Sequence, residues 1–168
     1  MIALFYLASA VALVAAAMAI SRRNAFHALL YVVVSLLAVA VVFFTIGAPF
    51  AGALEIIVYA GAIIVLFVFV VMMLNLGPSA VRVEDGFLTP AMWIGPGVLA
   101  AILLAELVVI ISGTGDGVTG AAIGPREVGL ALFGPYVVAV EVASFLLLAG
   151  LVGAAYLGSG ARISGGDR

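Results

Sequence analysis

The sequence predicts an all-α, polytopic membrane protein with five transmembrane helices. Hydrophobic residues make up 67% of its 168 residues and charged residues 8%, so a lipid bilayer must accommodate most of the apolar surface. The apolar residues form five stretches of about 20 residues, enough for a helix to cross about 30 Å of hydrocarbon. Glycine, proline and charged residues gather between these stretches.

The first two predicted spans are residues 1–20 and 26–46, and the polar turn Arg22-Arg23-Asn24 separates them. Asn24 is a residue type that caps helix N-termini. Small residues near the end of the first span would also suit a secretory signal peptide. No basic residue precedes this span and two arginines follow it, however, so we expect a retained helix.

Helix-breaking residues mark the ends of the third and fourth predicted spans. The segment Gly47–Gly52 is predicted to be a tight turn, after which the third span covers residues 53–76. The fourth span covers residues 91–111. Within it, Gly95-Pro96-Gly97 should loosen or kink the helix, because Pro96 lacks a backbone donor.

The fifth span is predicted at residues 136–157, so that a single membrane domain extends over residues 1–157. The segment 77–90 is polar and the segment 112–126 is rich in glycine, and both are predicted to be loops. Residues 158–168 are predicted to form a flexible cytoplasmic tail.

The distribution of arginine predicts the orientation, because loops that stay in the cytoplasm carry an excess of basic residues. With five spans and a cytoplasmic first turn, only Arg126 would lie outside. The other arginines would all lie inside: Arg22, Arg23, Arg82, Arg162 and Arg168. We therefore expect the N-terminus outside and the C-terminus in the cytoplasm.

The third span carries the strongest candidate site. Glu55 is its only acid, and Tyr59, four residues later, shares its face in a helix. The small residues Ala60, Gly61 and Ala62 follow directly. An acid inside a membrane span is costly, so by default it indicates a function, and proton handling is the chemistry that an acid beside a phenol suggests. Glu55 is also near the end of its span, and the alternative is that it only reaches the membrane interface.

Two other acids and the one histidine lie within the predicted spans. Glu106 is close to the end of its span, so we expect it to reach the membrane interface. Glu141 is deeper and either pairs with another helix or handles protons. His27 begins its helix beside two arginines and is expected to be an interfacial residue.

Several classes of site are excluded by composition. The chain has no cysteine, which rules out disulfides, iron–sulfur ligation and a thiol nucleophile. The arginines are scattered, so no basic surface for nucleic acid is expected. No phosphate-binding loop or cluster of metal ligands is apparent. The residues alone therefore indicate a polytopic protein that packs among other membrane helices.

Several segments together resemble the subunit J family of bacterial NADH:quinone oxidoreductase (respiratory complex I), whose mitochondrial counterpart is NADH dehydrogenase subunit six. The most specific is LEIIVYAGAIIVLFVFVVMMLNL at 54–76. The others, in order, are HALLY at 27–31, FAGALEIIVYAG at 50–61, WIGP at 93–96 and FGPYVVAVEVASFLLLAGLV at 133–152. The resemblance covers residues 1 to about 157.

The resemblance implies a function and a set of site residues. The third helix of this family carries a π-bulge, which here would span Tyr59 to about Val65. Its straightening would act as a conformational gate that makes or breaks a water path and so couples quinone reduction to proton pumping. The residues implied for the gate and proton path are Glu55, Tyr59, Gly61, Val65, Phe67 and Glu141. No role is implied for Glu106.

The resemblance also implies partners and a location. The chain would be a non-redox subunit of the enzyme in the bacterial inner membrane, not catalytic by itself. FMN, iron–sulfur clusters and quinone would belong to other subunits. Its neighbours would be lipid, subunits H, A, K and N, and the lateral helix of subunit L. A purely structural spacer subunit is the alternative. A stand-alone transporter is disfavoured, because the sequence shows no internal repeat.

Overall fold

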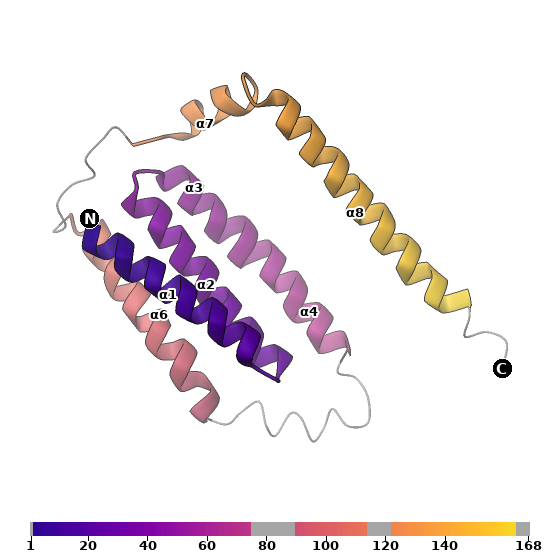
Figure 1. The fold of residues 1–168 in the computed structure, drawn as a ribbon, viewed down its shortest axis with the longest axis horizontal. Helices are drawn as coiled ribbons and strands as arrows, with labels where there is room; N and C mark the ends of the chain where they lie inside the picture. The colour runs from indigo at the N-terminus through magenta and orange to yellow at the C-terminus, as the bar shows by residue number, and fades with distance from the viewer. Residues whose placement is uncertain (1, 75–89, 114–121, 164–168) are drawn as a thin grey trace. The chain divides into compact units, whose positions relative to one another are not determined.

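The computed structural model describes residues 2–74, 90–113 and 122–163. Every regular element in these ranges is a helix, which confirms the all-α prediction. The chain divides into two compact units, Met1–Gly124 and Pro125–Arg168, and each is described by itself (Figure 1). Most of the predicted loop 77–90, the middle of the predicted loop 112–126 and the end of the tail lie outside the described residues.

The first unit begins with α1 (Ile2–Ser21) and α2 (Ala25–Thr45). A continuous helical rod follows, made of α3 (Pro49–Leu54), the π-helix η1 (Glu55–Ile63) and α4 (Ile64–Leu74) (Figure 1). The last helix of this unit is α6 (Pro90–Ile111). The second unit contains α7 (Pro125–Leu132) and α8 (Val137–Ile163).

Five helical segments among the described residues are long and apolar enough to cross a membrane. They are Ile2–Ser21, Ala25–Thr45, Pro49–Met73, Met92–Ile111 and Val137–Gly158. The prediction of five spans is confirmed by length and composition.

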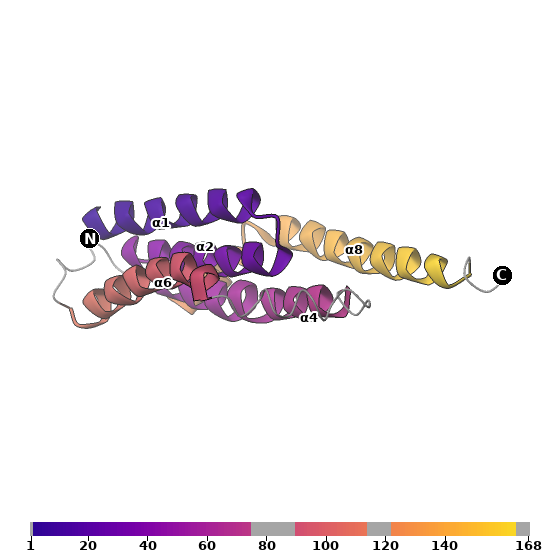
Figure 2. The ribbon, with the colours of Figure 1, turned by 90° about the horizontal axis from the view of Figure 1, so that it is seen from below.

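The core of the first unit lies between α1, α2 and α6. Helix α2 contacts α1, α6 and the α3–η1–α4 rod, and the two views place α1 and α4 on different sides of it (Figure 1, Figure 2). The Ser35 hydroxyl of α2 donates to the main-chain oxygen of Ala12 in α1 at 3.0 Å. Small and branched apolar residues fill the core: Ala8, Val11, Ala15, Val34, Ala38, Val41 and Leu103.

The turn between α1 and α2 forms as predicted around Asn24. Its side-chain oxygen accepts a hydrogen bond from the main-chain N–H of His27 at 3.1 Å, which caps α2. The His27 ring lies 5.2 Å from the Tyr31 ring, between centroids. The Arg22 guanidinium lies 5.2 Å from the centroid of the same Tyr31 ring. A cationic and aromatic cluster thus closes this end of α1 and α2.

The prediction of a turn over Gly47–Gly52 is correct for its first residues and wrong for the residues from Pro49 onward. Gly47, with φ of 82°, makes the turn, but α3 begins at Pro49. Proline suits the first helical position because its missing N–H would have no partner there. Gly52 is buried inside this helix, and a Cβ at this position would lie 3.0 Å from the Ala40 oxygen. Gly52 therefore allows α3 to approach α2 closely rather than ending a turn.

The bounds of α6 (Pro90–Ile111) agree with the predicted span to within one residue, whereas α7 and α8 differ from prediction. Helix α6 continues through Gly95, Pro96 and Gly97 without a break. A Cβ at Gly95 would collide with the Tyr31 hydroxyl, so this glycine lets α6 pack against α2. Helix α7 begins at Pro125, whereas the loop was predicted to continue to residue 126, and the residues after it were assigned to no span. Helix α8 continues to Ile163 instead of ending at residue 157.

Candidate functional site

The third span contains a π-helix of nine residues, Glu55–Ile63. At its end the N–H of Ile64 donates to the oxygens of Gly61 and Tyr59, three and five residues earlier. At its beginning the N–H of Glu55 donates to the oxygens of Ala51 and Gly52, so α3 still follows ordinary helical bonding. A π-helix contains more residues per turn than the α-helices that flank it, and such segments are frequent at functional sites.

A π-type distortion of the third helix was predicted, and the structure confirms it but shifts its position. It begins at Glu55 rather than at Tyr59, and it ends before Val65, which lies in α4. Gly61 is the glycine of this π-helix. A Cβ there would be 3.1 Å from the oxygen of Ile56, five residues earlier, which is tighter than most contacts of real side chains.

The predicted gate side chains of the first unit lie on the outer surface of the rod. Tyr59, Val65 and Phe67 are each about half exposed, and Glu55 is partly buried. Within the described part of the chain, no hydrogen bond joins the side chains of Glu55 and Tyr59. The chain by itself does not enclose this face, so lipid or another protein must cover it in a membrane.

Glu141 belongs to the second unit, whereas the other predicted gate residues belong to the first. It is exposed on α8. Ser144 lies three residues later, and its hydroxyl donates to the main-chain oxygen of Glu141 at 2.7 Å. Ser144 therefore hydrogen-bonds the helix backbone, and the Glu141 carboxyl group remains available to a partner outside its own helix.

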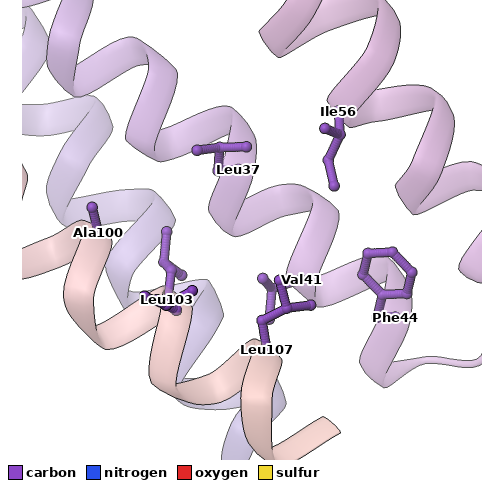
Figure 3. A pocket seen from close by; sticks show the side chains of 8 residues that line it. Leu37, Val41, Phe44, Ile56, Ala100, Leu103 and Leu107 are labelled. Atoms are coloured by element: carbon purple, nitrogen blue, oxygen red, sulfur yellow. The ribbon is translucent and has the colours of Figure 1, made fainter. Parts of the chain in front are cut away.

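An apolar cavity of about 160 Å³ adjoins the first turn of η1. Side chains from η1, α2 and α6 converge on it, with Ile56 supplied by the π-helix (Figure 3). Sequence reasoning did not predict this cavity. Its lining residues are all apolar: Leu37, Val41, Phe44, Ile56, Ala100, Leu103, Leu104 and Leu107.

Glu106 does not reach the interface as expected. Its side chain is 3% exposed and lies within the packed part of α6. Leu99, Leu103 and Ile110, at helical spacing on either side of it, pack into the same core. The sequence analysis placed Glu106 at the interface because it is near the helix end, and the apolar residues on every face of α6 gave no signal against this.

Comparisons with known proteins agree with the resemblance. The model of the family described as NADH-ubiquinone/plastoquinone oxidoreductase chain 6 matches residues 15–157. NADH-quinone oxidoreductase subunit J of Pseudomonas aeruginosa is 56% identical over 156 residues, covering 92% of this chain and 94% of the relative. Subunit J of Escherichia coli is 57% identical over 155 residues, covering 92% and 84%.

A more distant relative covers the same region. NADH-quinone oxidoreductase subunit J of Buchnera aphidicola from Schizaphis graminum is 46% identical over 155 residues, covering 92% of this chain and 95% of the relative. These relatives are bacterial, and the chain has five helices able to span a membrane. It is therefore a multi-pass protein of the bacterial inner membrane. By these matches the chain belongs to the NADH-ubiquinone/plastoquinone oxidoreductase chain 6 family.

Proposed function

We propose that the chain is the J subunit of a bacterial NADH:quinone oxidoreductase and that η1 is a conformational gate coupling quinone reduction to proton translocation. The observation that carries the gate is the nine-residue π-helix in a span that also holds Glu55 and Tyr59. Membrane helices need no π-helix to cross a bilayer, and π-helical turns are rare outside functional sites.

The gate works by an exchange of backbone hydrogen bonds. In the π-helix the N–H of Ile64 donates to Gly61 and Tyr59, and in an α-helix it would donate to Ala60. The exchange would move each backbone donor to an acceptor one residue away. Removing the one extra residue from the turn would rotate α4 by about 100° relative to α3.

This rotation would change what faces the proton path. From Ala60 to Leu74 the rod has no polar side chain, so it offers protons no route of its own. Water must enter beside the rod, and the half-exposed side chains of Val65 and Phe67 are placed to admit or exclude it. Glu55 and Tyr59 would receive or deliver protons at the end of this path.

The cavity beside Ile56 supports a mobile first turn. The apolar space there lies between the rod and its two neighbours, α2 and α6. Ile56 can move into it without displacing a packed side chain, which would be costly in a filled core.

Glu141 and the remaining partners belong to the same proposal. Because Glu141 is exposed in its own unit, its carboxyl group would meet a polar group of a neighbouring subunit in the complex. We propose subunits H, A, K and N and the lateral helix of subunit L as neighbours. FMN, iron–sulfur clusters and quinone would be bound by other subunits. The N-terminus would lie outside and the C-terminus in the cytoplasm.

A spacer subunit without a gate is the second candidate. The large apolar surface that the third span and α8 expose would also suit a subunit that only fills space between its neighbours. In that case Glu55→Gln and Glu141→Gln should reduce the amount of assembled complex. Under the gate proposal, both variants should assemble and lose proton translocation.

Gly61→Leu tests the gate. A side chain there meets the Ile56 oxygen in the π form and crowds the turn that must rearrange. We expect the assembled complex to reduce quinone while translocating fewer protons per electron. The control is Gly97→Leu on α6, where an added Cβ has no neighbour within 4 Å. A normal proton-to-electron ratio in Gly61→Leu contradicts the gate.

A further inference from the structure

Glu106 is a buried acid that the proposed gate does not use. Its side chain is 3% exposed, and both carboxyl oxygens lack a hydrogen-bond partner among the described residues. The core around it is formed by alanine, valine and leucine side chains of α1, α2 and α6. Buried carboxyl groups normally find a donor or a cation, so this arrangement requires an explanation.

No positive charge is placed to neutralise Glu106 in the three packed helices. Helix α1 has no charged residue. On α2 the only candidate is His27, which lies against the backbone of Met92 near the beginning of α6. Met92 and Glu106 are separated by about 21 Å of α-helix at 1.5 Å per residue.

The other charged groups among the described residues of the unit fail for similar reasons, and so does Tyr6. Arg22 packs on Tyr31, which lies beside Gly95, so both are at the same distant end as His27. Arg23 is adjacent to Arg22 in that turn. The Tyr6 side chain on α1 is 67% exposed. On the neighbouring rod, Glu55 is an acid and cannot supply a positive charge.

Two hydroxyl groups of α2 are already engaged. Ser35 donates to the oxygen of Ala12, and Thr45 donates to the oxygen of Val42. Neither is left to donate to the Glu106 carboxyl group. A carboxylate without donors or a cation is far less stable in such surroundings than a neutral carboxylic acid.

We propose that Glu106 is a proton-binding site, carrying its proton as a neutral carboxylic acid inside the α1–α2–α6 core. Glu106 is not one of the residues proposed for the gate. Its ligand is a single proton, bound to a carboxyl oxygen that the fold shields from solvent. The site does not depend on whether η1 switches.

Infrared difference spectroscopy of the purified, membrane-reconstituted complex tests the site. The wild-type minus Glu106→Gln spectrum should contain one carbonyl band of a protonated carboxylic acid, shifting to lower frequency after exchange into D₂O. The control is Glu127→Gln, which removes an exposed acid from the first turn of α7 and should give no such band. Carboxylate bands in the Glu106 difference spectrum overturn the proposal.

Assembly provides a second, independent readout. Because neutral Glu106 has no described partner to lose, Glu106→Gln and Glu106→Leu should assemble at the wild-type level. A severalfold loss of assembled complex in both variants, with normal assembly of Glu106→Asp, would show a required negative charge and overturn the proposal. Neither the infrared spectrum nor the amount of assembled complex measures proton pumping. A result that overturns the Glu106 proposal therefore does not test the gate, and a result that contradicts the gate does not test the Glu106 proposal.

Discussion

The amide of Ile64 donates to the carbonyl oxygen of Tyr59, five residues earlier in the third membrane span, and also to that of Gly61. The bond to Tyr59 lies at the end of a π-helix of nine residues, after which the chain returns to ordinary α-helix. The neighbouring acceptor, Ala60, is one residue closer. An α-helical form of the same rod would differ by one residue in register, and this difference is the physical basis of the proposed gate.

Filling the cavity beside η1 should restrain the gate. Ala100→Phe places a ring in the space that Ile56 faces, and we expect quinone reduction to continue with a reduced proton-to-electron ratio. The measurement is proton uptake against quinone reduction in proteoliposomes.

Ala101→Phe is the matched control for the cavity variant. Ala101 is exposed on the same helix and does not line the cavity. The proton-to-electron ratio of Ala101→Phe should therefore stay at the wild-type value. Equal ratios in the two phenylalanine variants would show that the cavity has no part in coupling.

Replacing Tyr59 by phenylalanine should lower proton translocation and leave assembly intact. The ring is half exposed on the rod and its hydroxyl makes no hydrogen bond to Glu55, so packing within this chain loses little. The hydroxyl is the group that could carry a proton. Proton uptake and native gels measured on the same membranes distinguish a loss of proton translocation from a loss of assembly. Loss of assembly with a normal proton-to-electron ratio favours the spacer role.

Gly52→Ala should destabilise the first unit. The added Cβ would lie 3.0 Å from the Ala40 oxygen and 3.2 Å from Cε2 of Phe44, so α3 must move away from α2. Such overpacking costs about 1–3 kcal/mol. The thermal midpoint of complex dissociation should fall.

The control for Gly52 is Gly97→Ala, where a Cβ meets open space. Alanine is a better helix former than glycine by up to about 1 kcal/mol, so this variant should be neutral or more stable. An unchanged midpoint in Gly52→Ala would mean that the close approach of α3 and α2 is not required.

Ser35→Ala removes a hydrogen bond that joins α2 to α1. The Ala12 oxygen remains part of the α1 backbone after the substitution. The expected loss of stability is therefore modest, about 0.5–1.5 kcal/mol. Ser21→Ala removes only an exposed bond to the oxygen of Ala17 within α1 and serves as the control. The thermal midpoint is again the measurement, and equal midpoints would contradict a role for the interhelical bond.

The sequence predicted the number and approximate position of the spans, because apolar length alone defines them. It could not predict which face of each span is buried. In a helix that is apolar all round, lipid-facing and core-facing positions carry the same residue types, so Glu106 was placed at the interface although it lies in the core.

Other errors have local causes. Gly47–Gly52 was interpreted as one turn because glycine and proline break helices, yet Pro49 begins α3 and Gly52 packs inside it. The π-helix has no side-chain pattern of its own beyond the small residues around Gly61. Its prediction depended on the family resemblance, and that resemblance placed it later than Glu55.

The most direct measurement is the backbone register of the third span in the intact complex, determined at rest and during turnover with NADH and quinone. The gate predicts that the Ile64 amide bonds to Tyr59 in one state and to Ala60 in the other, with α4 rotated between them. If Ile64 keeps the same acceptor in every state, with lipid rather than protein or water beside Tyr59, the η1 helix does not control proton movement.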